Sequence, residues 1–153
     1  MKDDKCSMWM AEEPDEARSQ IGIMLTALSN GKYEYFTIYR VPPDTEYDEF
    51  PDMDEVIQSR GYGQRFTVEV FQIGQDGLCR LFVVGHAQAA NDCDECEQIT
   101  APDGAIDWVR PAEVLDLAEA ISLFQHYYDH DCIPAGWHLR ERPEFTREVD
   151  ITD

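Results

Sequence analysis

The chain has 153 residues, of which 43% are apolar and 11% aromatic, a composition far from that of a disordered chain. Its 32 Asp and Glu against 12 Lys and Arg give a formal net charge of -20, which repels nucleic acid and anionic membrane surfaces and favours basic protein partners. No apolar run approaches the roughly 18 residues of a membrane span, and the length predicts a single domain.

The first half of the chain predicts a helix, a strand and a short helix. Residues 1–12 are expected to form a flexible arm. Pro14 opens a helix whose apolar residues recur at helical spacing up to the stop signal Asn30-Gly31. Residues 33–41 alternate and are rich in aromatic and β-branched side chains, which is typical of a strand. A short helix is expected from Met53 to Ser59, with Gly61 just past its end.

The second half begins with the clearest pair of strands, 65–73 and 78–87, which Gly74-Gln75-Asp76-Gly77 joins into a hairpin. Residues 88–104 show no apolar period and predict a long acidic loop, and 106–109 and 136–139 predict short strands. Pro111 is expected to open a helix over 111–128. One stripe of that helix carries Val114, Leu117, Ala118, Ile121, Phe124 and Tyr128.

Together these elements predict an α+β fold, an antiparallel sheet with helices packed on one face. The sheet should contain 33–41, 65–73 and 78–87, and the long helix should bury Leu117, Ile121 and Phe124 against it. Residues 13–140 form the expected single domain, and 141–153 are expected to be a polar, frayed tail.

The acidic excess is clustered, since no Lys or Arg occurs between Arg40 and Arg60 or between Arg80 and Arg110. Uniform acidification, as in an acid-rich or salt-loving organism, would spread the charge more evenly, so the clusters favour a docking surface. Two aromatics, Tyr47 and Phe50, lie within the first cluster, and they serve either as anchors for a partner or as anchors of the loop to the core. The predicted partner-binding residues are Asp44, Glu46, Tyr47, Asp48, Glu49, Phe50, Asp52, Asp54, Glu55, Asp92, Asp94, Glu95 and Glu97.

The five cysteines are an odd number without the spacing of a disulfide framework. Cys93 and Cys96 form a single CxxC among acids, and a zinc site would need further ligands from His126, His130 and Cys132. The surrounding carboxylates hold the thiols protonated, and no complete finger spacing occurs. We therefore expect no metal and no cofactor, and keep a zinc-binding domain or metal-dependent enzyme as an alternative.

No catalytic motif is present. His86 and His138 lie near the ends of predicted strands, without a Ser or Cys in a G-x-S-x-G elbow, and they are expected to be partly buried, hydrogen-bonded histidines. The HExxH, Walker A and EF-hand patterns are also missing. The sequence gives no positive case for an enzyme, and we expect a binding protein.

The second half also carries a family resemblance. Two strand segments, FTVEVFQIG and LCRLFVVG, precede a loop and the amphipathic segment RPAEVLDLAEAISLFQHYYDHDCIPAGW, in which Pro111, Ala118, Phe124, Pro134 and Trp137 occupy the characteristic positions. Over residues 53–140 this layout resembles the first-numbered immunity-protein family of bacterial polymorphic toxin systems. The resemblance implies a small α+β protein that is not an enzyme and that blocks one cognate toxin, of nuclease or deaminase-like type.

The sequence thus predicts an acidic binding protein that neutralises a basic cognate toxin by occlusion, without binding nucleic acid or membrane directly. Acids fill the N-terminus where a signal peptide needs an apolar stretch, which predicts a cytoplasmic location. The alternative is a DNA mimic that inhibits a nucleic-acid-binding protein with the same carboxylates. A toxin gene directly upstream would favour the immunity protein.

Overall fold

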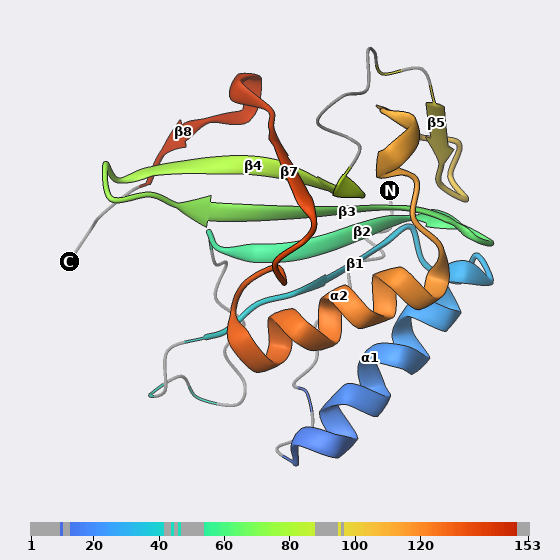
Figure 1. The fold of residues 1–153 in the computed structure, drawn as a ribbon. Helices are drawn as coiled ribbons and strands as arrows, with labels where there is room; N and C mark the ends of the chain where they lie inside the picture. The colour runs from blue at the N-terminus through green and yellow to red at the C-terminus, as the bar shows by residue number, and fades with distance from the viewer. Residues whose placement is uncertain are drawn as a thin grey trace.

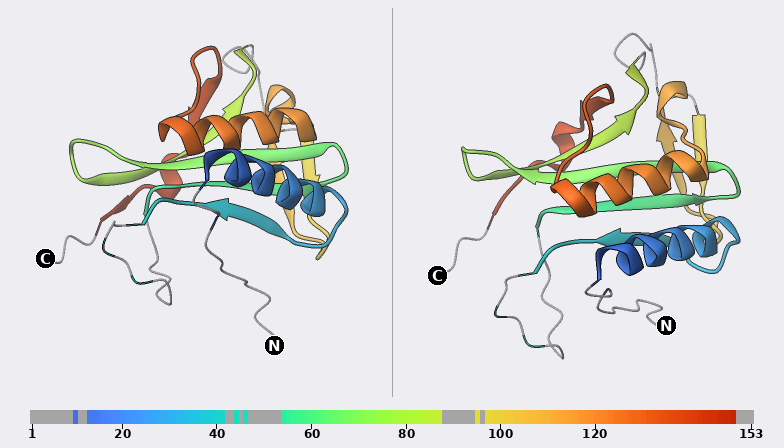
Figure 2. Two further views of the ribbon diagram at one scale, coloured as in Figure 1. Left: turned by 90° about the horizontal axis from the view of Figure 1, so that it is seen from below. Right: turned by 60° about the horizontal axis from the view of Figure 1, so that its bottom comes forward.

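The computed structural model describes residues 10, 13–41, 44, 46, 54–87, 95 and 97–149, and it has the predicted α+β architecture. A curved antiparallel sheet has two helices side by side on one face, while a two-stranded sheet lies at one end (Figures 1 and 2). None of the helices in the described ranges is long and apolar enough to cross a membrane.

Helix α1, Pro14–Ser29, begins and ends as predicted. Pro14 stands in its first turn, and the acids Asp15 and Glu16 face the positive end of its dipole. Ala17, Ile21, Leu25 and Leu28 are its buried face. The helix stops because Gly31 adopts a positive φ of 79°, from which its N–H donates to the Leu28 carbonyl.

Helix α2, Leu117–His130, starts later than predicted. Pro111–Glu113 is a separate 3-10 turn, η2, and Leu115 pairs with Phe66 in extended conformation. Asp116 then caps α2 in a reciprocal pair with Glu119. Since the Pro111 signal belongs to this extra turn, the sequence placed the helix start six residues too early.

The buried face of α2 also differs from the predicted stripe. Phe124 is fully buried as expected, but Leu117 and Ile121 are only half-buried and Ala118 is exposed. The core side consists of Ala120, Leu123, Phe124 and Tyr127. Two neighbouring apolar stripes run along this helix. The packing of α1 against α2 buries the stripe with Ala120 and Leu123, which the sequence analysis did not predict.

The main sheet has the order β1-β2-β3-β4-β7, with β8 also paired to β4 (Figure 1). All the pairings are antiparallel. The strands are β1 Tyr35–Ile38, β2 Val56–Tyr62, β3 Arg65–Ile73, β4 Leu78–Gly85, β7 His138–Glu141 and β8 Arg147–Glu148. The β3–β4 hairpin confirms the predicted pair, with Gly77 at a φ of 79° in the turn.

The predicted helix at Met53–Ser59 is wrong, because Val56–Tyr62 is a strand between β1 and β3. Its burial alternates, with Ile57 and Ser59 on the helix side. Pairing on both sides overrides the weak local helix signal. Gly61 is no helix stop either: it has a φ of 149°, and a Cβ there would lie 2.1 Å from the Arg65 carbonyl oxygen.

The predicted loop 88–104 ends in a strand, β5 Glu97–Thr100, which pairs with β6 Ile106–Val109. Strand β6 was predicted. Only two apolar side chains of β5–β6, Ile99 and Val109, pack inward, where they contact Val83 and Val114. The sequence of β5 therefore lacks the regular apolar–polar alternation that predicts a strand.

The chain beyond Leu139 is also more structured than the predicted frayed tail. Strand β7 runs to Glu141, a 3-10 turn (η3, Pro143–Phe145) follows, and β8 closes on the start of β4. These elements carry almost no buried apolar residue, so sequence periodicity does not reveal them.

Candidate functional site

Seven of the predicted partner-binding residues lie outside the described residues: Tyr47, Asp48, Glu49, Phe50, Asp52, Asp92 and Asp94. The two predicted aromatic anchors are among them. The structure places the other six, and they fall into two groups. Asp44 and Glu46 are exposed and form no ion pair with a described residue, whereas Asp54, Glu55, Glu95 and Glu97 all contact the protein's own chain.

The second group ties distant segments together. Asp54 pairs with Arg147 of β8 at 2.7 Å, and Glu97 of β5 pairs with Arg65 of β3 at 3.0 Å. The Ile73 amide donates to a Glu55 carboxylate oxygen at 3.5 Å. Glu95 lies 3.1 Å from Arg140 of β7. These four acids therefore contact the protein's own chain, and the assignment of all thirteen residues to a partner-binding surface stays a prediction.

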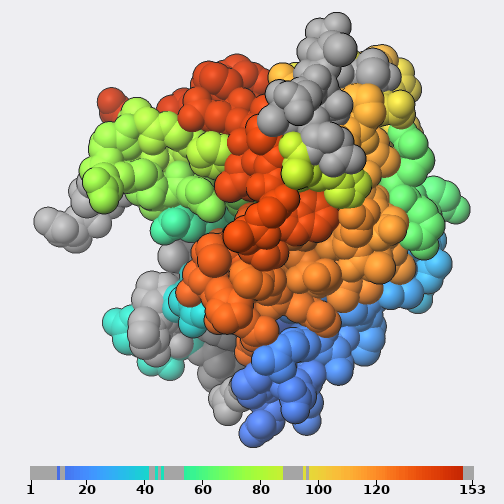
Figure 3. All heavy atoms as spheres, in the orientation of Figure 1, coloured from blue at the N-terminus to red at the C-terminus, as the bar shows by residue number. Residues whose placement is uncertain are grey.

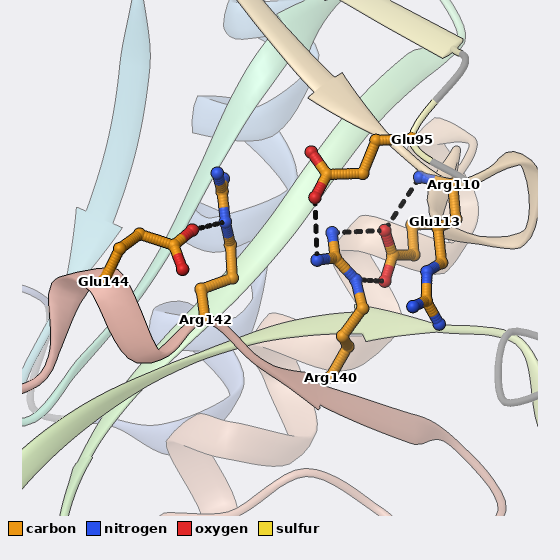
Figure 4. A network of polar contacts seen from close by, with 6 residues as sticks. All are labelled: Glu95, Arg110, Glu113, Arg140, Arg142 and Glu144. Carbon is orange, nitrogen blue, oxygen red and sulfur yellow. Dashed lines mark hydrogen bonds and ion pairs between the residues drawn. The ribbon is translucent and has the colours of Figure 1, made fainter. Parts of the chain in front are cut away.

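The contact of Glu95 belongs to a larger network under the two-stranded sheet (Figure 4). Glu113 of η2 is fully buried, and its two oxygens accept from Nε and Nη2 of Arg140 at 2.8 and 2.9 Å. The Arg110 amide also donates to Glu113, at 2.9 Å. This bidentate pair raises the pKa of Arg140 and fastens η2 to β7. Sequence analysis missed it, because Arg140 is the last residue of the expected domain and lies outside every predicted helix and strand.

A second buried carboxylate lies on the same side of the sheet. Glu69 of β3 is 8% exposed, and its carboxylate forms no hydrogen bond with a described side chain. Burial raises the pKa of Glu69, and Asp107 of β6 raises it further, while Arg60, Arg142 and Arg140 oppose the shift. Period-two alternation along β3 sets Glu69 on the face opposite Phe66, Val68 and Val70, so the sequence pattern predicts an outward-facing side chain and gives no signal of its burial.

Most cationic side chains of the described chain pair with the chain's own carboxylates, while Lys32 is exposed and forms no ion pair with a described residue. Eight arginines pair with carboxylates within 4 Å: Arg18, Arg40, Arg60, Arg65, Arg80, Arg140, Arg142 and Arg147. Exposed carboxylates without an ion pair to a described residue remain: Glu13, Glu16, Glu34, Asp44, Glu46, Glu55, Asp103, Asp116 and Glu148. Among the described residues, the exposed charges that no ion pair neutralises are therefore mostly negative.

His86 and His138 differ in their contacts. His86 follows β4, and its Nε2 lies 2.5 Å from a Glu119 carboxylate oxygen of α2. Its ring stacks on Trp137, with 5.4 Å between the ring centroids. These residues line a hollow of about 360 Å³. His138 has its Nδ1 buried without a hydrogen-bond partner among the described residues, so only His86 has the hydrogen bond that was predicted for both.

The alternative zinc set is only partly placed, because Cys93 and Cys96 lie outside the described residues. The rings of His126 and His130 are 4.4 Å apart at the end of α2, and the Cys132 sulfur lies 3.9 Å from His126 Nε2. Within the described part of the chain, no three His, Cys, Asp or Glu side chains are arranged to hold a metal ion.

Comparisons with protein-family models, with curated proteins and with solved structures found no match to this chain.

Proposed function

We propose that this protein is an acidic binding protein that neutralises a basic protein, a cognate toxin domain, by occluding it. The observation that carries the proposal is the charge arrangement: eight arginines are paired inside the fold, and exposed carboxylates remain unpaired. A formal net charge of -20 is unfavourable for a compact chain by itself, and a basic partner would relieve it.

The proposed contact surface is the acidic stretch from Asp44 to Asp52. Asp44 and Glu46 are exposed and unpaired among the described residues, so a partner meets free carboxylates there without breaking an internal ion pair. Arginine and lysine side chains that hold substrate phosphates in a nuclease would pair with these carboxylates, and charge-assisted pairs are stronger than neutral hydrogen bonds. Long-range attraction would also speed the encounter, most strongly at low salt.

The resemblance of residues 53–140 to an immunity family supports a toxin as the partner. That resemblance implies a small α+β protein, and this chain has an antiparallel sheet with helix α2 following strand β6. No catalytic step is assigned, because binding alone would account for neutralisation.

The test uses the product of the gene directly upstream as the partner. Asp44→Lys combined with Glu46→Lys should slow association at low salt and weaken its salt dependence, measured by surface plasmon resonance at several ionic strengths. The triple change of Asp48, Glu49 and Asp52 to Lys should have a similar or larger effect.

A matched control is Glu34→Lys with Asp103→Lys, which reverses two exposed acids outside the 44–52 stretch. It changes the net charge by the same amount but leaves the 44–52 stretch intact. If the control slows association as much as the Asp44 and Glu46 pair does, only overall charge matters and the assigned surface is wrong. Binding to a nucleic-acid-binding protein in place of the upstream product would identify a DNA mimic.

A further inference from the structure

The hollow beside Trp137 has the chemistry of a pocket for one positively charged side chain. It is lined by His86, Ala87, Glu119, Gly136 and Trp137 and has a volume of about 360 Å³. Three separate segments meet there: the end of β4, the first turn of α2 and the link before β7. Figure 3 shows these segments side by side on one face of the molecule. The hollow is near the lower end of the size range of ligand pockets, about 300–1,000 Å³.

The walls combine an aromatic surface with a carboxylate. The His86 ring stacks on the Trp137 indole with an interplanar angle of 27°, and Glu119 lies against the imidazole edge. The backbone N–H of His86 donates to the Ala112 carbonyl at 2.8 Å, which fixes where the ring can lie. Gly136 has a φ of 98°, and a Cβ there would meet no atom of a described residue within 4 Å.

Glu119 still has acceptor capacity, and its one contact with a basic side chain is the one to His86 among the described residues. One oxygen accepts the Asp116 amide at 3.1 Å, and the other contacts His86. An ionised carboxylate has about four acceptor sites, so about two remain. Its side chain is 29% exposed, and within the described chain no Arg or Lys lies within 4 Å of it. This contrasts with the carboxylates of Asp54, Glu97 and Glu113, which arginines already occupy.

The same position does not suit an anion, although it is the start of a helix. Two N–H groups of the first turn of α2 already have side-chain acceptors: Gln64 accepts from Leu117 at 3.1 Å, and Asp116 accepts from Glu119 at 2.8 Å. Two carboxylates, Asp116 and Glu119, occupy the positive end of the helix dipole. A negatively charged ligand would therefore meet repulsion and few free donors.

We propose that this hollow, defined by His86, Glu119 and Trp137, binds the guanidinium or ammonium group of an Arg or Lys side chain of the partner protein. The cation contacts the exposed part of the Trp137 indole and pairs with the Glu119 carboxylate. This inference rests on the proposed function for the identity of the partner, since a basic protein supplies such side chains. Trp and Arg are the side chains most enriched where binding energy concentrates in interfaces.

The first experiment needs no partner. N-acetyl-arginine amide and N-acetyl-glutamate amide are titrated into the ¹⁵N-labelled chain at low salt, and the indole N–H signal of Trp137 is followed by NMR. The arginine probe should give a saturable shift of this signal, while the glutamate probe gives none. A shift with the glutamate probe and none with the arginine probe would overturn the inference, as would no shift with either.

Two variants test the walls. Glu119→Gln removes the charge but keeps an oxygen for the Asp116 amide, so α2 stays capped. The arginine probe should then bind about tenfold more weakly. Trp137→Leu should weaken binding of the arginine probe by a similar factor, and here the His86 ring signals report the binding. The control is Trp108→Leu, which removes a different exposed indole on β6 and should leave the affinity unchanged. An unchanged affinity in Glu119→Gln contradicts the assignment.

The second experiment separates this inference from the proposed function. If the upstream gene product binds and Asp44→Lys with Glu46→Lys weakens it, while Glu119→Gln does not, the proposed function stands and the pocket assignment fails. If the arginine probe binds in the hollow but no basic protein binds the chain, the pocket stands and the proposed function fails.

Discussion

The two faces of the main sheet are covered by different chemistry. On the helix side, Ile57, Val68, Val70 and Val84 meet α1 and α2 in a core that is apolar except for the buried Ser59. On the other side, β5–β6, η2 and η3 cover a mixture of apolar and charged groups, in which Glu69 and Glu113 are buried. The first face gains stability from apolar area removed from water, while the second depends on each buried charge having a partner.

This difference predicts that breaking a buried charge pair on the second face costs at least as much stability as removing a buried core side chain on the first. Arg140→Met leaves the fully buried Glu113 carboxylate with only the Arg110 amide, and should lower the free energy of unfolding by about 3–5 kcal/mol. Urea denaturation measures it. Adding Glu113→Gln removes the unpaired charge and should recover part of the loss. A double variant no more stable than Arg140→Met would show that the charge is not the cause.

On the helix face, the exposure of each side chain should rank the losses. Leu123→Ala removes a fully buried side chain and should cost about 2–5 kcal/mol. Ile121→Ala removes a half-buried one, so we expect about 1–2 kcal/mol. Equal losses in the two variants, measured by the same denaturation, would favour the stripe predicted from the sequence over the one in the structure.

Glu69 gives the second face a pH dependence that the first face lacks. The pKa of Glu69 is raised above the ordinary 4.5. Between pH 4.5 and this raised pKa, the folded chain therefore keeps a proton on Glu69 that the unfolded chain has lost. The stabilising contribution of protonated Glu69 is therefore complete below pH 4.5 and is lost as the pH rises through the folded pKa. Glu69→Gln should remove this decline and raise the stability at pH 7. Thermal melts from pH 4 to 8 compare the two chains, and parallel profiles would exclude Glu69 as the source.

The smallest effect is expected for the exposed acids. Asp44→Lys with Glu46→Lys removes no ion pair to a described residue, so the free energy of unfolding should change by no more than about 0.5 kcal/mol. For comparison, Asp54→Ala removes an acid that does form an ion pair, the 2.7 Å contact to Arg147. The free energy of unfolding should then fall by about 0.5–1 kcal/mol. A larger loss in the Asp44 and Glu46 variant would mean that these acids stabilise the fold.

The same comparison explains what the sequence could predict. Helix α1, the β3–β4 hairpin, β6 and the fold class were predictable because apolar periodicity and turn residues mark an apolar core. Strand β2 was not, since its pairing with strands on both sides, rather than local propensity, determines it. The ends of α2 and the course after Leu139 depend on Asp116, Glu113 and Arg140, whose charge contacts leave no periodic pattern.

For the candidate site, the sequence located the acidic clusters but could not tell free carboxylates from paired ones. Asp54, Glu95 and Glu97 have the composition of a docking surface, yet each meets an arginine from a distant segment. Likewise the contact of His86 with Glu119 and Trp137 joins residues 33 and 51 positions away from His86, which no local motif reveals.

The most direct test of the account is calorimetric titration of the intact chain with the upstream gene product at about 50 and 200 mM salt. The account predicts a one-to-one complex that weakens steeply as salt is raised, and weakens less steeply in the Asp44→Lys, Glu46→Lys variant. No complex, or a complex whose affinity is the same at both salt concentrations and in the variant, would contradict the assignment of this acidic surface to a basic partner.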